Sequence, residues 1–159
     1  MTPVATANAK VVVERLRAWN PQAVADVIEF RGDTTIVVPK ELLRATAEYC
    51  KENSELKFDL LSDATCVDRF PMEPRFELNY QLVSIPRRER ICLRTVVSGQ
   101  HAVVDSLMPV WLGANWLERE VFDLFGIHFE GHTDLRRILL PDGFQGAPLR
   151  RDFPVEGKR

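Results

Sequence analysis

The chain has 159 residues, of which 45% are hydrophobic and 28% charged, and its formal net charge at neutral pH is −2. This size and composition predict one globular domain with a single hydrophobic core. A slightly acidic chain is a poor general nucleic-acid binder, because nonspecific affinity grows with the number of phosphates neutralised. No apolar run approaches the about 20 residues that cross a bilayer. Residues 1–10 lack the pattern of a secretory signal, so neither membrane insertion nor export is expected.

Periodicity and turn residues predict an α-β-β-α-β-β-β order in the first two thirds of the chain. Residues 1–9 are predicted to be disordered. The elements that follow are a helix over 11–19, strands over 24–31 and 34–38 joined at Gly32-Asp33, a helix over 39–51, a strand over 56–68, and a hairpin of 76–85 with 90–97. This order favours an α+β fold of two layers, in which helices cover one face of a mixed β-sheet.

The last third is predicted to contain one helical stretch and then an extended tail. Asp105 and Ser106 are expected to cap a helical stretch that ends at Phe125 and bends near Pro109 or Gly113. Beyond Gly126, closely spaced glycines and prolines exclude a long helix or strand. These residues are Gly131, Pro141, Gly143, Gly146, Pro148 and Pro154. We therefore divide the chain into a domain of residues 1–132 and an extended, partner-binding C-terminal tail of residues 133–159.

Residues 118–137 are unusually rich in charge. Part of this segment lies in the helix expected over 115–125, and the side chains of such a helix would fall on two opposite arcs. The predicted core arc consists of Leu117, Val121, Leu124 and Phe125. The opposite arc consists of Trp116, Arg119, Glu120 and Asp123. Arg119 and Asp123 stand four residues apart and can pair, an interaction that contributes only a few tenths of a kcal/mol if it is exposed. The charged arc is interpreted as a surface that another protein recognises.

Glu118 projects at the edge of the apolar arc of this helix. A carboxylate there is expected to be partly desolvated and to need a donor, because an unpaired buried charge costs several kcal/mol. The two Leu-Arg-Arg sequences, at 135–137 and 149–151, supply candidate arginines. The alternative is a Glu118 side chain that simply reaches water.

The tail carries six basic residues and too few apolar ones to fold alone. It is predicted to become ordered across a partner, with arginines donating to carboxylates or backbone carbonyls of that partner. The basic residues are Arg136, Arg137, Arg150, Arg151, Lys158 and Arg159.

The cysteines and histidines do not predict a metal or redox centre. Cys50, Cys66 and Cys92 are odd in number and far apart, which fits neither a disulfide framework nor an iron–sulfur or zinc site and indicates buried thiols in a reducing compartment. His128 and His132 lie in a segment expected to be extended, where they would be about 13 Å apart. His132 is interpreted as a turn residue or an intersubunit hydrogen-bond donor.

Two other functions fit the sequence less well than a binding role. An enzyme could use Glu118, Glu120 and Asp123 as acid and base, but Glu118 and Glu120 diverge by about 200° on a helix, and no phosphate loop or nucleophile elbow is present. A nucleic-acid module could use the tail arginines, but these alternate with aspartates and lack aromatic residues for base stacking.

Residues 105–154 carry a dense and specific motif. It comprises Glu118-Arg119-Glu120, Asp123-Leu124-Phe125-Gly126-Ile127, Gly131-His132, Asp134-Leu135-Arg136-Arg137-Ile138-Leu139, Pro141-Asp142-Gly143 and residues 148–154, preceded by Trp111, Ala114, Asn115 and Trp116. This motif resembles the signature of the C subunit, the 30 kDa-type subunit, of respiratory complex I, NADH:quinone oxidoreductase. The earlier part of the chain agrees with that family only in element order.

The resemblance implies a non-redox scaffold subunit of the peripheral arm of a proton-translocating electron-transport enzyme. It implies no catalytic, cofactor or metal residues in this chain, with FMN and the iron–sulfur clusters in partner subunits and quinone reached only through the complex. The D subunit of complex I is the expected principal partner, with the cluster-bearing B and I subunits nearby, at the cytoplasmic face of the bacterial inner membrane. The expected interface residues are Glu118, Arg119, Glu120, Asp123, His132, Arg136, Arg137, Arg150 and Arg151. The alternative is the equivalent subunit of a membrane-bound hydrogenase-type complex.

Overall fold

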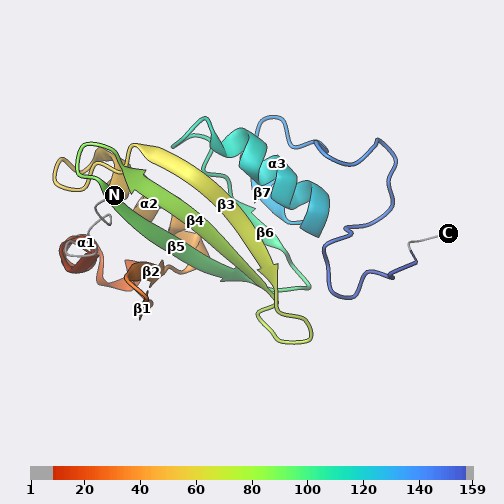
Figure 1. Cartoon of the computed structure of the whole chain (residues 1–159), viewed down its shortest axis with the longest axis horizontal. Helices are drawn as coiled ribbons and strands as arrows, with labels where there is room; N and C mark the ends of the chain where they lie inside the picture. The colour runs from red at the N-terminus through yellow and green to blue at the C-terminus, as the bar shows by residue number, and fades with distance from the viewer. Residues whose placement is uncertain (1–8, 157–159) are drawn as a thin grey trace.

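The computed structural model describes residues 9–156, which form a five-stranded sheet, a separate pair of short strands and three α-helices (Figure 1). The sheet has the strand order β1-β2-β5-β4-β3. Its strands are β1 Asp26–Phe30, β2 Asp33–Val37, β3 Leu60–Asp68, β4 Phe76–Ser84 and β5 Glu89–Val97. The helices are α1 Ala9–Trp19, α2 Leu43–Glu52 and α3 Ala114–Phe125, with 3-10 turns η2 Pro21–Ala23 and η3 Lys40–Leu42.

The predicted hairpin between β1 and β2 forms, but its turn lies one residue earlier than the predicted Gly32-Asp33. Arg31 and Gly32 join the two strands, and both have positive φ angles of 50° and 90°. Two consecutive left-handed residues give a turn whose twist matches that of the flanking strands. Phe30 therefore pairs directly with Asp33, and the antiparallel register continues to Asp26 opposite Val37.

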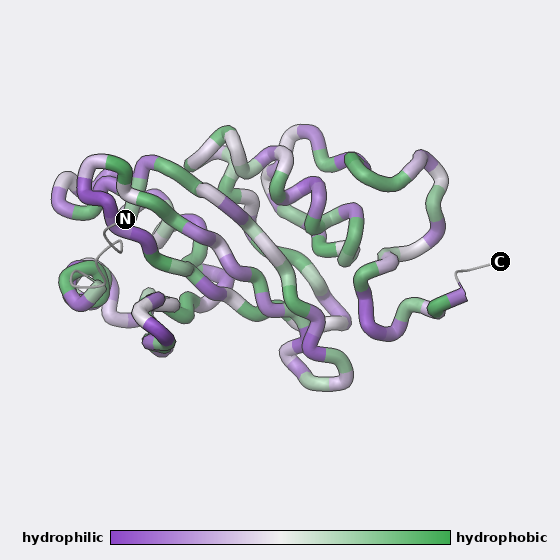
Figure 2. Tube along the Cα trace, viewed as in Figure 1, coloured by the Kyte–Doolittle hydropathy of each residue, from purple (hydrophilic) through white to green (hydrophobic). Residues whose placement is uncertain are grey.

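One face of the sheet builds the core. Alternate residues of β4 and β5 point into it, because successive side chains of a strand face opposite sides; they include Phe76, Leu78, Tyr80, Leu82, Ile91 and Leu93. The helices supply Leu16, Leu43 and Val121 to the same core. The opposite face carries polar residues such as Glu77, Asn79 and Arg94, and hydropathy alternates along these strands in Figure 2.

The sheet is mixed, because β2 pairs with β5 in parallel while β1–β2, β5–β4 and β4–β3 are antiparallel. Helices cover one face, so the predicted α+β fold of two layers is confirmed. A second sheet consists of β6 Val103–Asp105, which precedes α3 in the sequence, and β7 His128–Glu130, which follows it. These two strands pair in parallel. This pairing brings the end of α3 back beside the residues that precede the helix.

Several predicted boundaries are wrong. The helical stretch begins at Ala114 and not near Asp105, because Asp105 ends β6 and residues 106–113 form turns. The helix expected from residue 39 starts with the 3-10 turn η3. The third strand begins at Leu60 rather than at residue 56, since Leu56 and Phe58 enter the core ahead of the strand.

The termini differ from each other. Ala9, expected to be disordered, is the buried first residue of α1, whereas residues 1–8 lie outside the described part of the chain. Residues 131–156 contain no helix or strand, and Figure 1 shows this tail passing α3 and then turning back. Within residues 9–156 no helix has the length and apolar character needed to span a bilayer.

Candidate subunit interface

Glu118, which the sequence predicts to be partly desolvated, is fully buried, and its partner is not the expected arginine. The Ser106 hydroxyl donates to Oε2 at 2.6 Å, and the Leu107 N–H donates to Oε1 at 2.6 Å. No ion pair of Glu118 is found among residues 9–156. Ser106, predicted to cap a helix, instead joins the turn after β6 to α3. Glu118 thus has an internal positioning role, and its side chain is not available to a partner.

Burial without a counter-charge raises the pKa of Glu118 from 4.5 to about 7, although the bonds from Ser106 and Leu107 oppose this shift. A raised carboxyl pKa means that the folded state binds more protons than the unfolded state between these two values. Stability is then undiminished below pH 4.5 and falls as the pH rises toward about 7. The difference between these two pKa values corresponds to a loss of about 3 kcal/mol in the free energy of unfolding.

Glu118→Gln removes this titration and tests the assignment. We expect the free energy of unfolding of the variant, relative to that of the unmodified chain, to increase between about pH 4.5 and pH 7 and then to level off. Urea denaturation across that range measures it, with Glu120→Gln as the control on the exposed side of the same helix. A constant difference over the whole range would show that Glu118 binds the same number of protons in the folded and unfolded states, and would contradict the raised pKa.

Arg119 is buried and binds the tail, and it does not form the pair with Asp123 that the helical spacing allows. Its Nε donates to the carbonyl of Arg136 at 3.1 Å and its Nη2 to the carbonyl of Arg137 at 3.2 Å. Its Nη1 lies 3.8 Å from a carboxylate oxygen of Asp134. The tail of the same chain therefore covers Arg119 and Asp123, whereas Trp116 and Glu120 of the same arc remain exposed.

Asp123 binds the tail through both of its carboxylate oxygens. The residue is buried, with an exposed fraction of 1%. Its Oδ2 accepts the N–H groups of Ile138, Leu139 and Leu140 at 3.1, 2.8 and 2.8 Å. Its Oδ1 accepts Nη1 of Arg137 at 2.6 Å. Burial opposes ionisation, but these donors outweigh it and lower the pKa of Asp123. Consecutive N–H groups around one carboxylate form a concave anion site, here filled by the protein itself.

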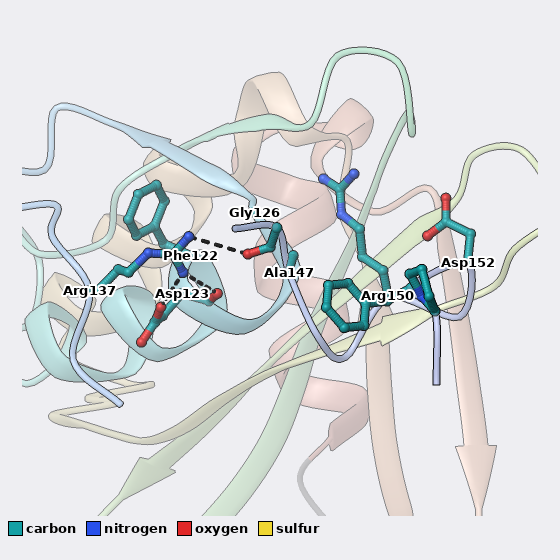
Figure 3. A pocket seen from close by; sticks show the side chains of 10 residues that line it. Phe122, Asp123, Gly126, Arg137, Ala147, Arg150 and Asp152 are labelled. Carbon is teal, nitrogen blue, oxygen red and sulfur yellow. Dashed lines mark hydrogen bonds and ion pairs between the residues drawn. The ribbon is translucent and has the colours of Figure 1, made fainter. Parts of the chain in front are cut away.

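Arg137, which binds Asp123, also binds two backbone carbonyls farther along the tail. Its Nη2 donates to the carbonyls of Phe144 at 2.9 Å and Gly146 at 3.2 Å, so one guanidinium joins α3 to two points of the tail. Figure 3 shows Arg137 bound to Asp123 of α3. A planar guanidinium has five donors in a fixed arrangement and suits such a junction. The arginine that the sequence assigns to a partner is thus used inside the chain.

Arg150 binds the C-terminal end of α3. Its Nε donates to the carbonyl of Phe125 at 2.6 Å, one of the carbonyls that a helix end leaves unpaired. Its guanidinium also lies 5.1 Å from the centroid of the Phe76 ring. Gly126 ends the helix with a φ of +72°, and a Cβ there would be 3.0 Å from Nη2 of Arg150. Glycine therefore allows both the left-handed turn and the close approach of this arginine.

The end of the tail is held by Arg75, a residue that no sequence motif marks. Arg75 donates to both carboxylate oxygens of Asp68 at 2.8 Å and to those of Asp152 at 3.0 and 2.6 Å. The backbone N–H of Arg151 adds a bond to Asp68 at 2.8 Å. The hydrogen bonds from Arg75 lower the pKa of both carboxyl groups. Arg75 and Asp152 are 77 residues apart, and no local pattern reveals the contact.

A cavity of about 360 Å³ lies between the end of α3 and the tail (Figure 3). Its charged side chains already have partners in the chain, as the bonds of Arg137, Arg150 and Asp152 show. Its other walls are largely apolar; they include Phe122, Ala147, Phe153 and Pro154. This chemistry suits contact with another surface more than acid–base chemistry.

The remaining predicted residues are more accessible. Glu120 and Arg151 are exposed, and Arg136 is exposed while its Nε donates to Asp134. His132 lies in a turn, where Nδ1 accepts the Asp134 N–H at 3.0 Å and Nε2 lies 3.2 Å from the Asn115 carbonyl. Of the residues expected to face a partner, Glu118, Arg119 and Asp123 are buried by their own chain.

The three cysteines are free thiols, as expected. Cys50 and Cys92 are buried and Cys66 is half-buried. Burial raises the pKa of Cys50 and of Cys66 to about 12, which suits apolar packing and not nucleophilic chemistry. Among residues 9–156 there is no cluster of three or more histidine, cysteine or carboxylate residues that could hold a metal ion.

Comparison with known proteins places the chain in a family. The family described as "Respiratory-chain NADH dehydrogenase, 30 Kd subunit" matches residues 36–159. The C subunit of the NADH-quinone oxidoreductase of Geotalea uraniireducens (strain Rf4) is 41% identical over 99% of this chain and 93% of the relative. The C subunit of the Roseiflexus sp. (strain RS-1) enzyme is 45% identical over 91% and 83%.

Solved structures agree with these sequence matches. A trypsin-resistant fragment (1–134) of Nqo5 is 32% identical with a TM-score of 0.69, over 79% of this chain and 98% of the fragment. A chain of the membrane-bound sulfane sulfur reductase, an archaeal respiratory membrane complex, has a TM-score of 0.78 over 93% of this chain and 86% of that one. Its 24% identity shows the shared fold alone. The chain therefore belongs to the family of the 30 kDa subunit of respiratory-chain NADH dehydrogenase, the family that contains the C subunit of NADH-quinone oxidoreductase.

Proposed function

We propose that this chain is a scaffold subunit, without a redox centre of its own, in the peripheral arm of a proton-translocating NADH:quinone oxidoreductase. The family match and the 41–45% identity to the C subunits of such enzymes over nearly the whole chain carry the proposal. FMN and the iron–sulfur clusters that move electrons from NADH to quinone belong to partner subunits. The geometry supports a scaffold, because the charged residues of the motif fix the shape of the tail.

The proposed partners are the D subunit, as the principal neighbour, and the cluster-bearing B and I subunits. The chain joins them as a peripheral protein at the cytoplasmic face of the bacterial inner membrane. The exposed motif residues Glu120, Arg136 and Arg151 are available for direct contacts. The buried motif residues act on the interface through the position of the tail.

Purification of the complex through a tag on this chain tests the proposal. We expect the D, B and I subunits, together with the flavin-bearing NADH-oxidising subunits, to copurify, and the preparation to reduce quinone with NADH. The isolated chain should be colourless, without stoichiometric iron or flavin. Recovery of hydrogenase subunits in place of the NADH-oxidising ones would assign the chain to the related complexes instead.

A cysteine-free variant separates a scaffold from a cluster-bearing subunit. Replacing Cys50, Cys66 and Cys92 by alanine should leave every iron–sulfur signal of the assembled complex intact in electron paramagnetic resonance. Stability should fall, since buried Cys50 fills space in the core. Loss of one cluster signal from a complex that still assembles would overturn the proposal.

A further inference from the structure

Tyr80 carries a polar group inside the core that no residue of the described chain satisfies. It lies in β4 and is 1% exposed, and its hydroxyl oxygen has no hydrogen-bond partner within residues 9–156. A buried hydroxyl without a partner is costly, and tyrosine hydroxyls inside proteins usually find one. The Tyr80 O–H therefore needs an acceptor within the core.

Glu118 places a carboxylate on the same side of the sheet. Tyr80 pairs with Ala64 of the edge strand β3, and α3, which carries Glu118, packs beside β3 (Figure 1). Burial raises the pKa of the Tyr80 hydroxyl, and the charges of Glu118 and Cys66 raise it further. The charge of Glu118 thus acts on Tyr80 through the core, where little solvent screens it.

The Glu118 carboxylate can accept more hydrogen bonds than the chain supplies. A carboxylate offers about four acceptor positions, and within residues 9–156 Glu118 accepts only from the Ser106 hydroxyl and the Leu107 N–H. The Ser106 hydroxyl donates its one proton to Glu118, while its oxygen accepts the Met108 N–H. Tyr80 therefore has a donor without an acceptor, and Glu118 has acceptor positions without donors.

We infer that one internal water molecule joins Tyr80 to Glu118, and that this link depends on the charge of the carboxylate. The two side chains do not bond each other directly. A water that accepts the Tyr80 O–H and donates to the carboxylate has the two polar partners that a buried water needs. Hydrogen bonds to a charged acceptor are about twice as strong as those to a neutral one. Uptake of a proton by Glu118 therefore weakens the link between β4 and α3.

No other charged group on the neighbouring elements pairs with Glu118 within residues 9–156. The titratable and charged groups on these elements are Asp63, Cys66 and Asp68 of β3, Asp105 of β6, His128 and Glu130 of β7, and Asp134, Arg136, Arg137 and Arg150 of the tail. Asp68 is bound by Arg75, and Arg137 and Arg150 bind other parts of α3. Burial raises the pKa of Cys66 to about 12, so its thiol stays neutral while Glu118 titrates.

Titration of the Glu118 carboxyl in the full chain tests the link. Carbon-13 NMR follows the glutamate carboxyl signals against pH, and the signal that Glu118→Gln removes belongs to Glu118. We expect Tyr80→Phe to raise the pKa of Glu118 by about 0.5 or more, because the ionised form loses the donor that orients the water. Tyr49→Phe is the matched control, since the Tyr49 hydroxyl bonds to residues of α1 and the end of α2. It should leave the pKa of Glu118 unchanged.

An unchanged pKa of Glu118 in Tyr80→Phe overturns the inference. A lowered pKa also overturns it, because Tyr80 would then accept a proton from neutral Glu118. A high-resolution crystal structure of the unmodified chain, grown at a pH above the raised pKa of Glu118, is a second test that needs no variant. We expect one ordered water within hydrogen-bond distance of both Tyr80 Oη and a carboxylate oxygen of Glu118. Electron density without such a water, or a direct bond between the two side chains, would contradict the assignment.

Discussion

Asp123→Ala is expected to lower the free energy of unfolding by about 3–5 kcal/mol. The substitution leaves the Arg137 guanidinium without its carboxylate and removes the common acceptor of three N–H groups at residues 138–140. Each donor that loses its acceptor away from water adds to the cost. Urea denaturation of the isolated chain measures the effect, and it should be among the largest produced by any single charged residue of the motif.

Glu120→Ala is the matched control on the same helix. Glu120 is exposed, so its removal should change stability by no more than about 0.5 kcal/mol. Asp123→Asn should fall between the two, because it keeps an oxygen acceptor but loses the charge that Arg137 pairs with. Equal effects of Asp123→Ala and Glu120→Ala would contradict the buried position of Asp123.

Arg75→Ala is the second substitution with a large expected effect, again about 3–5 kcal/mol. It leaves the carboxylates of Asp68 and Asp152 without their shared partner, and the Asp68 side chain is only 2% exposed. Arg75→Lys should not restore stability, since one ammonium cannot replace paired bonds to two carboxylates. Arg90→Ala is the control, because the exposed pair of Arg90 and Asp33 is worth about 1 kcal/mol or less.

The same cluster predicts a dependence on acid. Hydrogen bonds from Arg75 hold the pKa of Asp68 and of Asp152 below the ordinary value of 3.8. Their contribution to stability is therefore complete above pH 3.8 and is lost as the pH falls through the lowered pKa values. The stability difference between the unmodified chain and Arg75→Ala should shrink in that acidic range. A difference that stays constant there would exclude this pairing.

The sequence predicted the sheet and most helices because their signals are local. Gly32, in the left-handed conformation, marks the turn between β1 and β2, and alternation along β4 and β5 marks the core face. The start of α3 was misplaced because Ser106 looks like a helix cap, whereas its hydroxyl bonds to Glu118, twelve residues later. A side chain that reaches across a turn leaves no periodic signal.

The candidate site was predicted only in part. A helical pattern assigns Arg119 and Asp123 to the same arc, but it cannot say what covers these two side chains, and the tail does so. The arginine forks that the sequence assigns to a partner's carboxylates and carbonyls are, for Arg137 and Arg150, bound to carboxylate and carbonyl groups of this chain. The acceptors of Arg137 and Arg150 thus belong to this chain and not to a partner.

Hydrogen–deuterium exchange at the amides of residues 138–140 tests most directly whether the charged motif positions the tail from within the chain. The hydrogen bonds to Asp123 predict slow exchange of these amides in the isolated chain, and fast exchange after Asp123→Ala. The Glu120→Ala control should exchange as slowly as the unmodified chain. Fast exchange in the isolated unmodified chain, slowed only by assembly into the complex, would contradict this account and show that a partner orders the tail.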